Sequence, residues 1–82
     1  MARVRVRLFA ILRESVGKET VELEVPEGAS CQELVSQFDL EFGPFEGLLK
    51  RSFIAVNGEY SPPAAPVSPG DEVALLPPVS GG

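Results

Sequence analysis

The end of the chain carries the group best suited to chemistry, a free carboxylate on the glycine pair Gly81-Gly82. Glycine has no side chain, so such an end can enter a slot too narrow for any other residue pair. The preceding prolines, Pro77-Pro78, favour an extended conformation and should make the tail project from the fold. Terminal glycines also occur in frayed chain ends. The sequence nevertheless predicts that Gly82 carries the reacting group, that Gly81 passes through a constriction, and that Val79 and Ser80 are contact residues.

Other reactive residue types have simpler structural explanations. Cys31 falls in the first turn of a predicted helix, where a thiolate is favoured, but the chain has no histidine to act with it. We therefore interpret Cys31 as a structural thiol. Asp71 and Glu72 form a carboxylate pair, and we interpret them as capping a turn and flanking a strand. The missing histidine excludes His-based catalysis and His-ligated metal, so we expect no metal site and no bound cofactor.

Composition limits the class of protein. A chain of 82 residues with 44% apolar residues is expected to form one domain over residues 1–82, with 77–82 as its exposed tail. Its net charge of −5 argues against nucleic acid as a partner. A single cysteine excludes an internal disulfide framework. The sequence shows no apolar run near membrane-spanning length and no signal-peptide pattern, so we expect a soluble, cytoplasmic protein with no membrane partner.

The first half of the chain alternates apolar and charged residues. Arg3 to Phe9 and Thr20 to Val25 both follow the two-residue period of a strand with one buried face. The first strand carries arginines and the second glutamates, so paired neighbours would set opposite charges against each other. Between them, Ala10 to Val16 reads as a short helical turn that Gly17 ends.

The second half begins with a helix and ends with strands. Ser30 and Glu33 have the spacing of a capping box, which predicts a main helix from about Cys31 to Phe38, or slightly longer. Phe42 to Leu49, interrupted by Gly43-Pro44, is expected to be a loop that leads into a short second helix. Three further strands are predicted, with a hairpin turn at Asn57-Gly58 between the first two: Phe53 to Val56, one beginning at Glu59-Tyr60, and Glu72 to Leu76.

This order of elements predicts an α+β protein with the β-grasp, or ubiquitin-like, fold. One main helix would pack on a mixed sheet of about four to five strands, and the first and last strands, which are the most apolar, would lie side by side in its middle. A ferredoxin-like fold would need a second full helix before the last strand.

Strand parity predicts a partner-binding surface. With Val4, Val6 and Leu8 directed to the core, Phe9 falls on the outer face of its strand, and Leu76 falls outward on the last strand. Tyr60, at the start of a nearby strand, is expected to join them. Single exposed apolar residues are ordinary, but a cluster beside a reactive tail favours an interface.

Four segments of the chain carry distinctive motifs: Phe9-Ala10-Ile-Leu-Arg-Glu14 followed by Gly17, Ala55-Val-Asn57, Gly70-Asp-Glu-Val-Ala74, and Pro77-Pro-Val-Ser-Gly-Gly82. Together they resemble the family of small subunits of molybdopterin synthase (MoaD). The resemblance covers nearly the whole chain, and its final motif is the most specific.

The resemblance implies a sulfur carrier that is itself non-catalytic. In that family an adenylating enzyme of the ubiquitin-activating type (MoeB-like) activates the terminal carboxylate with ATP, and a persulfide sulfur donor converts it to a thiocarboxylate. The tail then enters the large subunit (MoaE-like), which holds the active site and uses the sulfur to convert cyclic pyranopterin monophosphate to molybdopterin for molybdenum cofactor. A heterotetramer with the large subunit is implied. The chain has no Gly-x-x-x-x-Gly-Lys-Ser/Thr loop, so the ATP site must belong to the partner enzyme.

Three alternatives stay open at this point. The chain could carry sulfur for thiamine, tRNA thiolation or cysteine synthesis. It could be a ubiquitin-like modifier joined to target lysines, because modifiers share the fold, the tail and the activation step. It could also be a pure binding domain, in which deletion of Gly81-Gly82 would change nothing.

Overall fold

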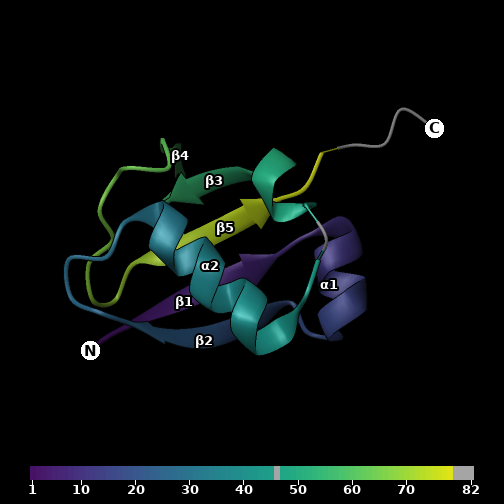
Figure 1. Ribbon diagram of the computed structural model, residues 1–82, viewed down its shortest axis with the longest axis horizontal. Coiled ribbons are helices and arrows are strands. Elements are labelled where there is room, and N and C mark those ends of the chain that lie inside the picture. Colours follow the sequence, from purple (N-terminus) through teal and green to yellow (C-terminus); the bar gives the residue numbers. More distant parts are fainter. Residues whose placement is uncertain (46, 79–82) are drawn as a thin grey trace.

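The computed structural model describes residues 1–45 and 47–78, so Glu46 and the four predicted tail residues, Val79 to Gly82, lie outside the described residues. One mixed sheet with the strand order β2-β1-β5-β3-β4 runs through this part of the chain (Figure 1). Its strands are β1 (Ala2–Leu8), β2 (Thr20–Val25), β3 (Phe53–Val56), β4 (Glu59–Tyr60) and β5 (Glu72–Leu76). The helices are α1 (Ala10–Val16), α2 (Cys31–Phe42) and the 3-10 turn η1 (Leu49–Arg51).

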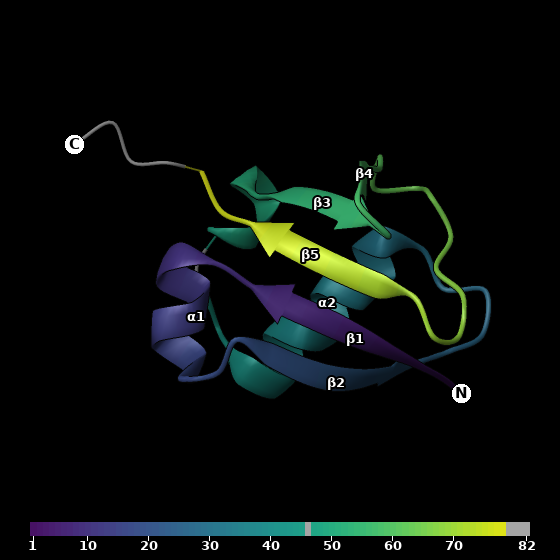
Figure 2. The same cartoon turned by 180° about the vertical axis from the view of Figure 1, so that it is seen from behind.

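The first and last strands lie side by side in the middle of the sheet, as the sequence predicts. β1 and β5 are parallel, whereas β1 with β2 and β5 with β3 are antiparallel (Figure 2). Parallel neighbours need a crossover connection, and α2 lies within the one that joins them. The β-grasp prediction is therefore confirmed.

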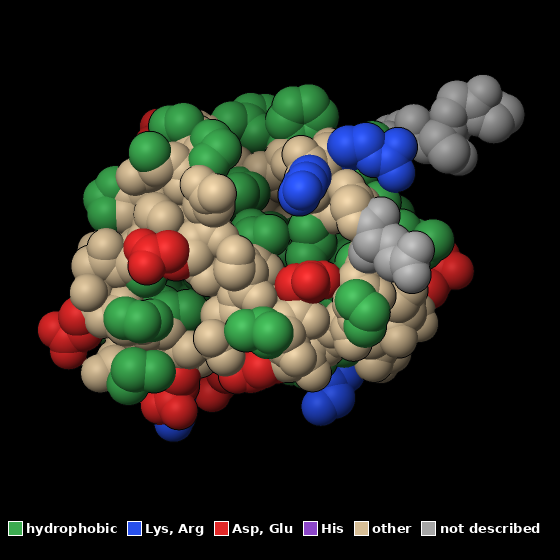
Figure 3. Space-filling view, in the orientation of Figure 1, with side chains coloured by type: hydrophobic (Ala, Val, Ile, Leu, Met, Phe, Trp, Pro, Cys, Tyr) green, Lys and Arg blue, Asp and Glu red, His purple; other side chains and the backbone are tan. Residues whose placement is uncertain are grey.

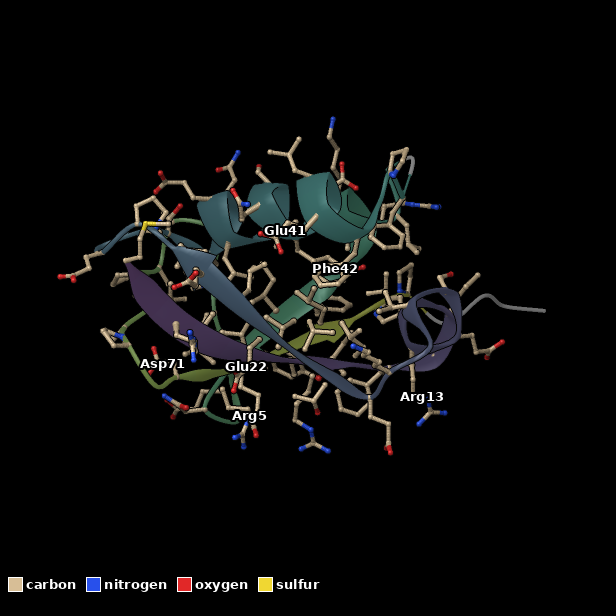
Figure 4. The ribbon with its side chains drawn as sticks, turned by 90° about the horizontal axis from the view of Figure 1, so that it is seen from below. Arg5, Arg13, Glu22, Glu41, Phe42 and Asp71 are labelled. Carbon is tan, nitrogen blue, oxygen red and sulfur yellow. The ribbon has the colours of Figure 1, made fainter. Side chains whose placement is uncertain are left out.

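The core lies between this sheet and α2. Val4 and Val6 of β1 are buried, as are Val73 and Leu75 of β5, and α2 contributes Phe38 among others. The charged residues of β1 and β2 take the other side of the sheet. Figure 4 shows the Arg5 side chain pointing away from α2.

The predicted charge pairing across the first two strands is present. In the β1–β2 register, Arg3 lies opposite Glu24 and Arg5 opposite Glu22. A guanidinium nitrogen of Arg3 lies 3.7 Å from a carboxylate oxygen of Glu22, and both side chains are exposed. Exposed pairs of this kind contribute about 0–1 kcal/mol, so they favour the strand register more than they stabilise the fold.

Helix α2 begins where the sequence predicts and ends four residues later than Phe38. The N–H of Glu33 donates to Ser30 Oγ at 3.2 Å and the N–H of Ser30 donates to Glu33 Oε1 at 2.9 Å, which completes the capping box. At the other end, the ring centroid of Phe38 lies 5.2 Å from that of Phe42 and 5.4 Å from that of Phe45. Phe42 lies between α2 and the sheet (Figure 4). This aromatic packing favours the additional helical turn.

The short second helix predicted to follow the loop from Phe42 to Leu49 is the 3-10 turn η1, which begins at Leu49 and ends at Arg51. It leads directly into β3. No helix within the described ranges is both long and apolar enough to cross a bilayer.

The Asn57-Gly58 hairpin turn does more than reverse the chain. Both residues have positive φ, 51° and 88°, as a type I′ turn requires. The side-chain Nδ2 of Asn57 donates to Asp71 Oδ1, and the side-chain Oδ1 of Asn57 accepts from the N–H of Glu72, each at 3.0 Å. Asp71 Oδ2 also accepts from the N–H of Ser68 at 2.8 Å. Asp71 and Glu72 therefore cap a turn and begin a strand, as predicted, and Asn57 fixes where β5 begins.

Candidate functional site

The chain leaves the sheet at the end of its central strand. β5 ends at Leu76, and the next residues are half-buried Pro77 and exposed Pro78. Proline has no N–H to donate to a neighbouring strand, so the ladder stops there. The predicted reacting residue, Gly82, lies outside the described residues.

An exposed aromatic pair lies beside this point. In the β3–β5 register Phe53 is directly opposite Leu76, and in the β3–β4 register Tyr60 is opposite Ala55. The side chains of Phe53 and Tyr60 are 64% and 75% exposed, although both are aromatic. Their ring centroids are 5.9 Å apart in an edge-to-face arrangement. The pair forms an apolar surface that continues from Leu76.

Phe9 extends this surface on the other side of Leu76. It directly follows β1, with an extended backbone, and is half-buried. The β1–β5 register pairs Leu8 with Leu75, so Phe9 continues that pairing towards Leu76. The guanidinium of Arg7 lies 5.4 Å from the Phe9 ring centroid and 3.8 Å from a carboxylate oxygen of Glu72.

These four residues, Phe9, Phe53, Tyr60 and Leu76, are here called the outer apolar face. Strand parity selects Phe9 and Leu76 as partner-binding, and Tyr60 is expected to join them from a nearby strand. The structure places all three on the sheet face opposite α2. Phe9 lies just beyond β1 and not within it, because the strand ends at Leu8. Sequence reasoning missed Phe53. Ile54 and Val56 pack against the core, so Phe53 faces outward, but all four residues of β3 are apolar and their pattern does not distinguish the two faces.

Cys31 has the environment of a structural thiol. It is completely buried, with 0% exposure, and is the first residue of α2. Burial raises the pKa of the Cys31 thiol above its ordinary value, and the negative charge of Asp71 raises it further. A neutral, buried thiol is a poor nucleophile. The chemistry of the site therefore does not involve Cys31.

The described residues contain no cluster of three or more His, Cys, Asp or Glu side chains that could hold a metal ion. They offer instead a docking surface next to a chain end.

Known sequences resemble the chain over nearly its whole length. The ThiS family model matches residues 6–82. A molybdopterin synthase sulfur carrier subunit from Arabidopsis thaliana is 35% identical over 79 residues, which cover 96% of this chain and 82% of that protein. The subunit of the same name from Chlamydomonas reinhardtii is 33% identical over 82 residues, 98% of this chain and 99% of that protein.

Solved structures resemble it as well. SAMP1 from Haloferax volcanii superimposes with a TM-score of 0.87 at 28% identity, covering 99% of this chain and 100% of that one. A chain in the protein–protein complex of subunits 1 and 2 of molybdopterin-converting factor from Helicobacter pylori superimposes with a TM-score of 0.65 at 27% identity, covering 98% and 99%. These structures share the fold of this chain over nearly its whole length. The chain belongs to the ThiS family and has its ubiquitin-like β-grasp fold.

Proposed function

We propose that this chain is the sulfur carrier subunit of a molybdopterin synthase and that the carboxylate of Gly82 carries the sulfur. The observation that carries the proposal is the departure of the chain from the central strand directly beside the outer apolar face. A partner that binds this face is positioned to receive the residues that follow Pro78. The relatives that carry the name of this subunit are similar to this chain over nearly its whole length, which supports the same proposal.

The terminal carboxylate needs activation before it can accept sulfur. An α-carboxyl group has a pKa of about 3.5, so at neutral pH it is an anion and a poor electrophile. In the proposed route, an adenylating enzyme joins a Gly82 oxygen to the α-phosphate of ATP, and pyrophosphate leaves. The terminal sulfur of a persulfide then attacks the carbonyl carbon and AMP leaves. A second thiol cleaves the resulting S–S bond, which releases the thiocarboxylate and forms a disulfide.

The proposed acceptor is cyclic pyranopterin monophosphate held in the large subunit. Two carriers would supply the two sulfurs of the dithiolene, each discharged carrier leaving with a restored carboxylate. The solved Helicobacter pylori complex of two converting-factor subunits supports a direct contact of this kind. We propose that the large subunit docks on the outer apolar face and assembles with the carrier as a heterotetramer.

Intact-mass measurement of the chain tests this proposal. Incubation with ATP, a MoeB-type adenylating enzyme and a persulfide donor should increase the mass by the replacement of one oxygen by sulfur. The increase should disappear when ATP is omitted. Absence of the increase under conditions that modify a known carrier of this family would overturn the proposal.

A second candidate function is a ubiquitin-like protein modifier. The observation that favours it is the TM-score of 0.87 to SAMP1, a protein that a second solved structure describes as small archaeal modifier protein 1. The modifier function predicts isopeptide bonds between Gly82 and lysines of other proteins in cells. Mass spectrometry of cell lysate separates the two functions, because a carrier yields the thiocarboxylate without conjugates.

A further inference from the structure

A groove lies on the helix side of the sheet, between α2 and the segment that contains η1 and the beginning of β3. Its volume is about 370 Å³, and Val35, Leu49 and Ile54 contribute apolar side chains to its lining. Ser36 of α2 and Lys50 of η1 also line it. Figure 3 shows this face of the molecule, with a hollow beside α2 and hydrophobic side chains inside it. The groove has room for one or two side chains of another protein.

Two adjacent basic residues stand between this groove and the point where the chain leaves the sheet. Lys50 and Arg51 both belong to η1 and are both exposed. Because Phe53 is paired with Leu76 in antiparallel register, the residues before Phe53 flank those after Leu76. Figure 3 shows basic side chains gathered at this end of the face. In a chain with a net charge of −5, this is a local positive surface beside the tail.

The groove and the outer apolar face lie on opposite sides of the sheet but meet at β3. Phe53 points outward to the apolar face, and the next residue, Ile54, lines the groove. A protein bound to the outer apolar face therefore leaves the groove open. A carrier that binds two proteins in succession can present the outer apolar face to both of them. If only one of the two proteins also binds the groove, the carrier can distinguish between them.

We propose that the groove and the Lys50-Arg51 pair form a second docking site, used by the adenylating enzyme and not by the large subunit. The occupant is a loop of that enzyme, which places an apolar side chain against Val35 and Ile54 and carboxylates against Lys50 and Arg51. This inference rests on the proposed function, because it assumes that the tail is adenylated.

Charge complementarity favours this occupant. An acidic loop would be repelled by most of this acidic chain and attracted to the basic pair beside the tail. The carboxylate of Asp39 also lines the groove, but its Oδ1 already accepts the N–H of Phe45 at 3.0 Å. Charges at the rim of an interface act mainly on the association rate. An adenylating enzyme that binds and releases one carrier after another would gain from such an effect.

The test compares matched variants in two assays. Lys50→Glu reverses a charge at the proposed site, and Lys18→Glu makes the same change in the turn after α1. Ser36→Trp fills the groove from α2, and Leu40→Trp places the same ring on that helix where Leu40 is 80% exposed. The assays are kcat/KM of the carrier in adenylation, measured by pyrophosphate release, and calorimetric binding to the large subunit. Thermal unfolding establishes that each variant is folded.

Lys50→Glu and Ser36→Trp should lower kcat/KM about 10-fold or more, and high salt should remove most of the difference between Lys50→Glu and the wild type. The two control variants should behave like the wild type, and all four should bind the large subunit normally. The inference would be overturned if Lys50→Glu and Ser36→Trp were adenylated like the wild type, or if they lost large-subunit binding as much as adenylation. Either result would leave the proposed function intact. A wild-type chain that the enzyme does not adenylate would overturn the proposed function as well.

Discussion

Phe9 is the single residue on which the proposed docking depends most clearly. It is half-buried and does not contact the deep part of the core. The guanidinium carbon of Arg7 lies over its ring, 5.4 Å from the ring centroid. We expect Phe9→Ala to weaken binding to the large subunit by about 1–3 kcal/mol, because aromatic anchors dominate interface energies. Its effect on the free energy of unfolding should be smaller than the roughly 3–5 kcal/mol expected for a buried phenylalanine such as Phe38. Calorimetry and urea unfolding measure the two quantities.

Leu40→Ala is the control for this prediction, because Leu40 is an exposed apolar residue on α2, away from the outer apolar face. It should leave binding unchanged. If Phe9→Ala binds as tightly as wild type, the docking surface lies elsewhere. If it unfolds the protein, Phe9 belongs to the core.

Cys31 gives the chain a specific dependence of stability on pH. Because burial raises the pKa of this thiol above 9.0, the unfolded chain ionises first as pH rises. The folded state then binds more protons than the unfolded state, and the free energy of unfolding falls above about pH 9. Urea unfolding of wild type and Cys31→Ala at about pH 8 and about pH 10 should show the wild type losing more stability. An equal loss in both proteins would contradict the prediction.

At single residues, the sequence was most informative where apolar and charged residues alternate along a whole strand. The alternation of Val4, Val6 and Leu8 was sufficient to place Phe9 on the outer side. In the strand that begins at Phe53 only four residues are available, and all are apolar, so the buried and exposed sides differ little in composition. That is the physical reason why Phe53 was not assigned to the outer apolar face.

At the scale of the element, the capping box of α2 makes a measurable contribution. Ser30→Ala removes the acceptor for the N–H of Glu33, and we expect a loss of about 0.5–2 kcal/mol in the free energy of unfolding. Ser36→Ala is the matched control, since Ser36 is an exposed serine within the same helix. It should have no destabilising effect, because alanine favours the helix interior. If chemical denaturation shows that Ser30→Ala and Ser36→Ala lower the free energy of unfolding equally, the loss in Ser30→Ala does not come from the helix cap.

The beginning of α2 was easier to predict than its end. Ser30 and Glu33 mark the beginning of α2 by local hydrogen bonds, which the sequence encodes within four residues. Its end depends on contacts that Phe38 makes with Phe42 and Phe45, and such packing exists only after the chain folds. The link from Asn57 to Asp71 escaped prediction for the same reason, since it joins residues 14 positions apart.

At the scale of the whole molecule, folding and reaction are expected to be separable. The buried core of the described residues extends no further along the chain than Leu75. Deletion of Gly82 should therefore leave Tm and circular dichroism unchanged while abolishing adenylation and sulfur transfer. Deletion of Leu76 to Gly82 is the contrasting variant, because it also removes the β5 residue paired with Phe53. A large drop in Tm on deletion of Gly82 alone would show that the residue stabilises the fold.

The central pairing of β1 with β5 was predicted from the sequence, and its physical basis is simple. The main helix lies between these two strands in the chain and makes the crossover that a parallel pair requires. The helix-side groove did not follow from the sequence. It results from the spacing of α2 and η1 across β3, which no local pattern specifies.

The central position of β5 also sets the order of events when the protein is made. Every other strand leaves the ribosome before β5, yet β1 and β3 have no direct contact in the sheet and wait for β5 to fill the space between them. Until then both strands have unpaired edges of the kind that promote misassociation. A chain whose synthesis stops before β5 would therefore lack a closed sheet. The last strand to be made is the one that joins the two halves of the sheet.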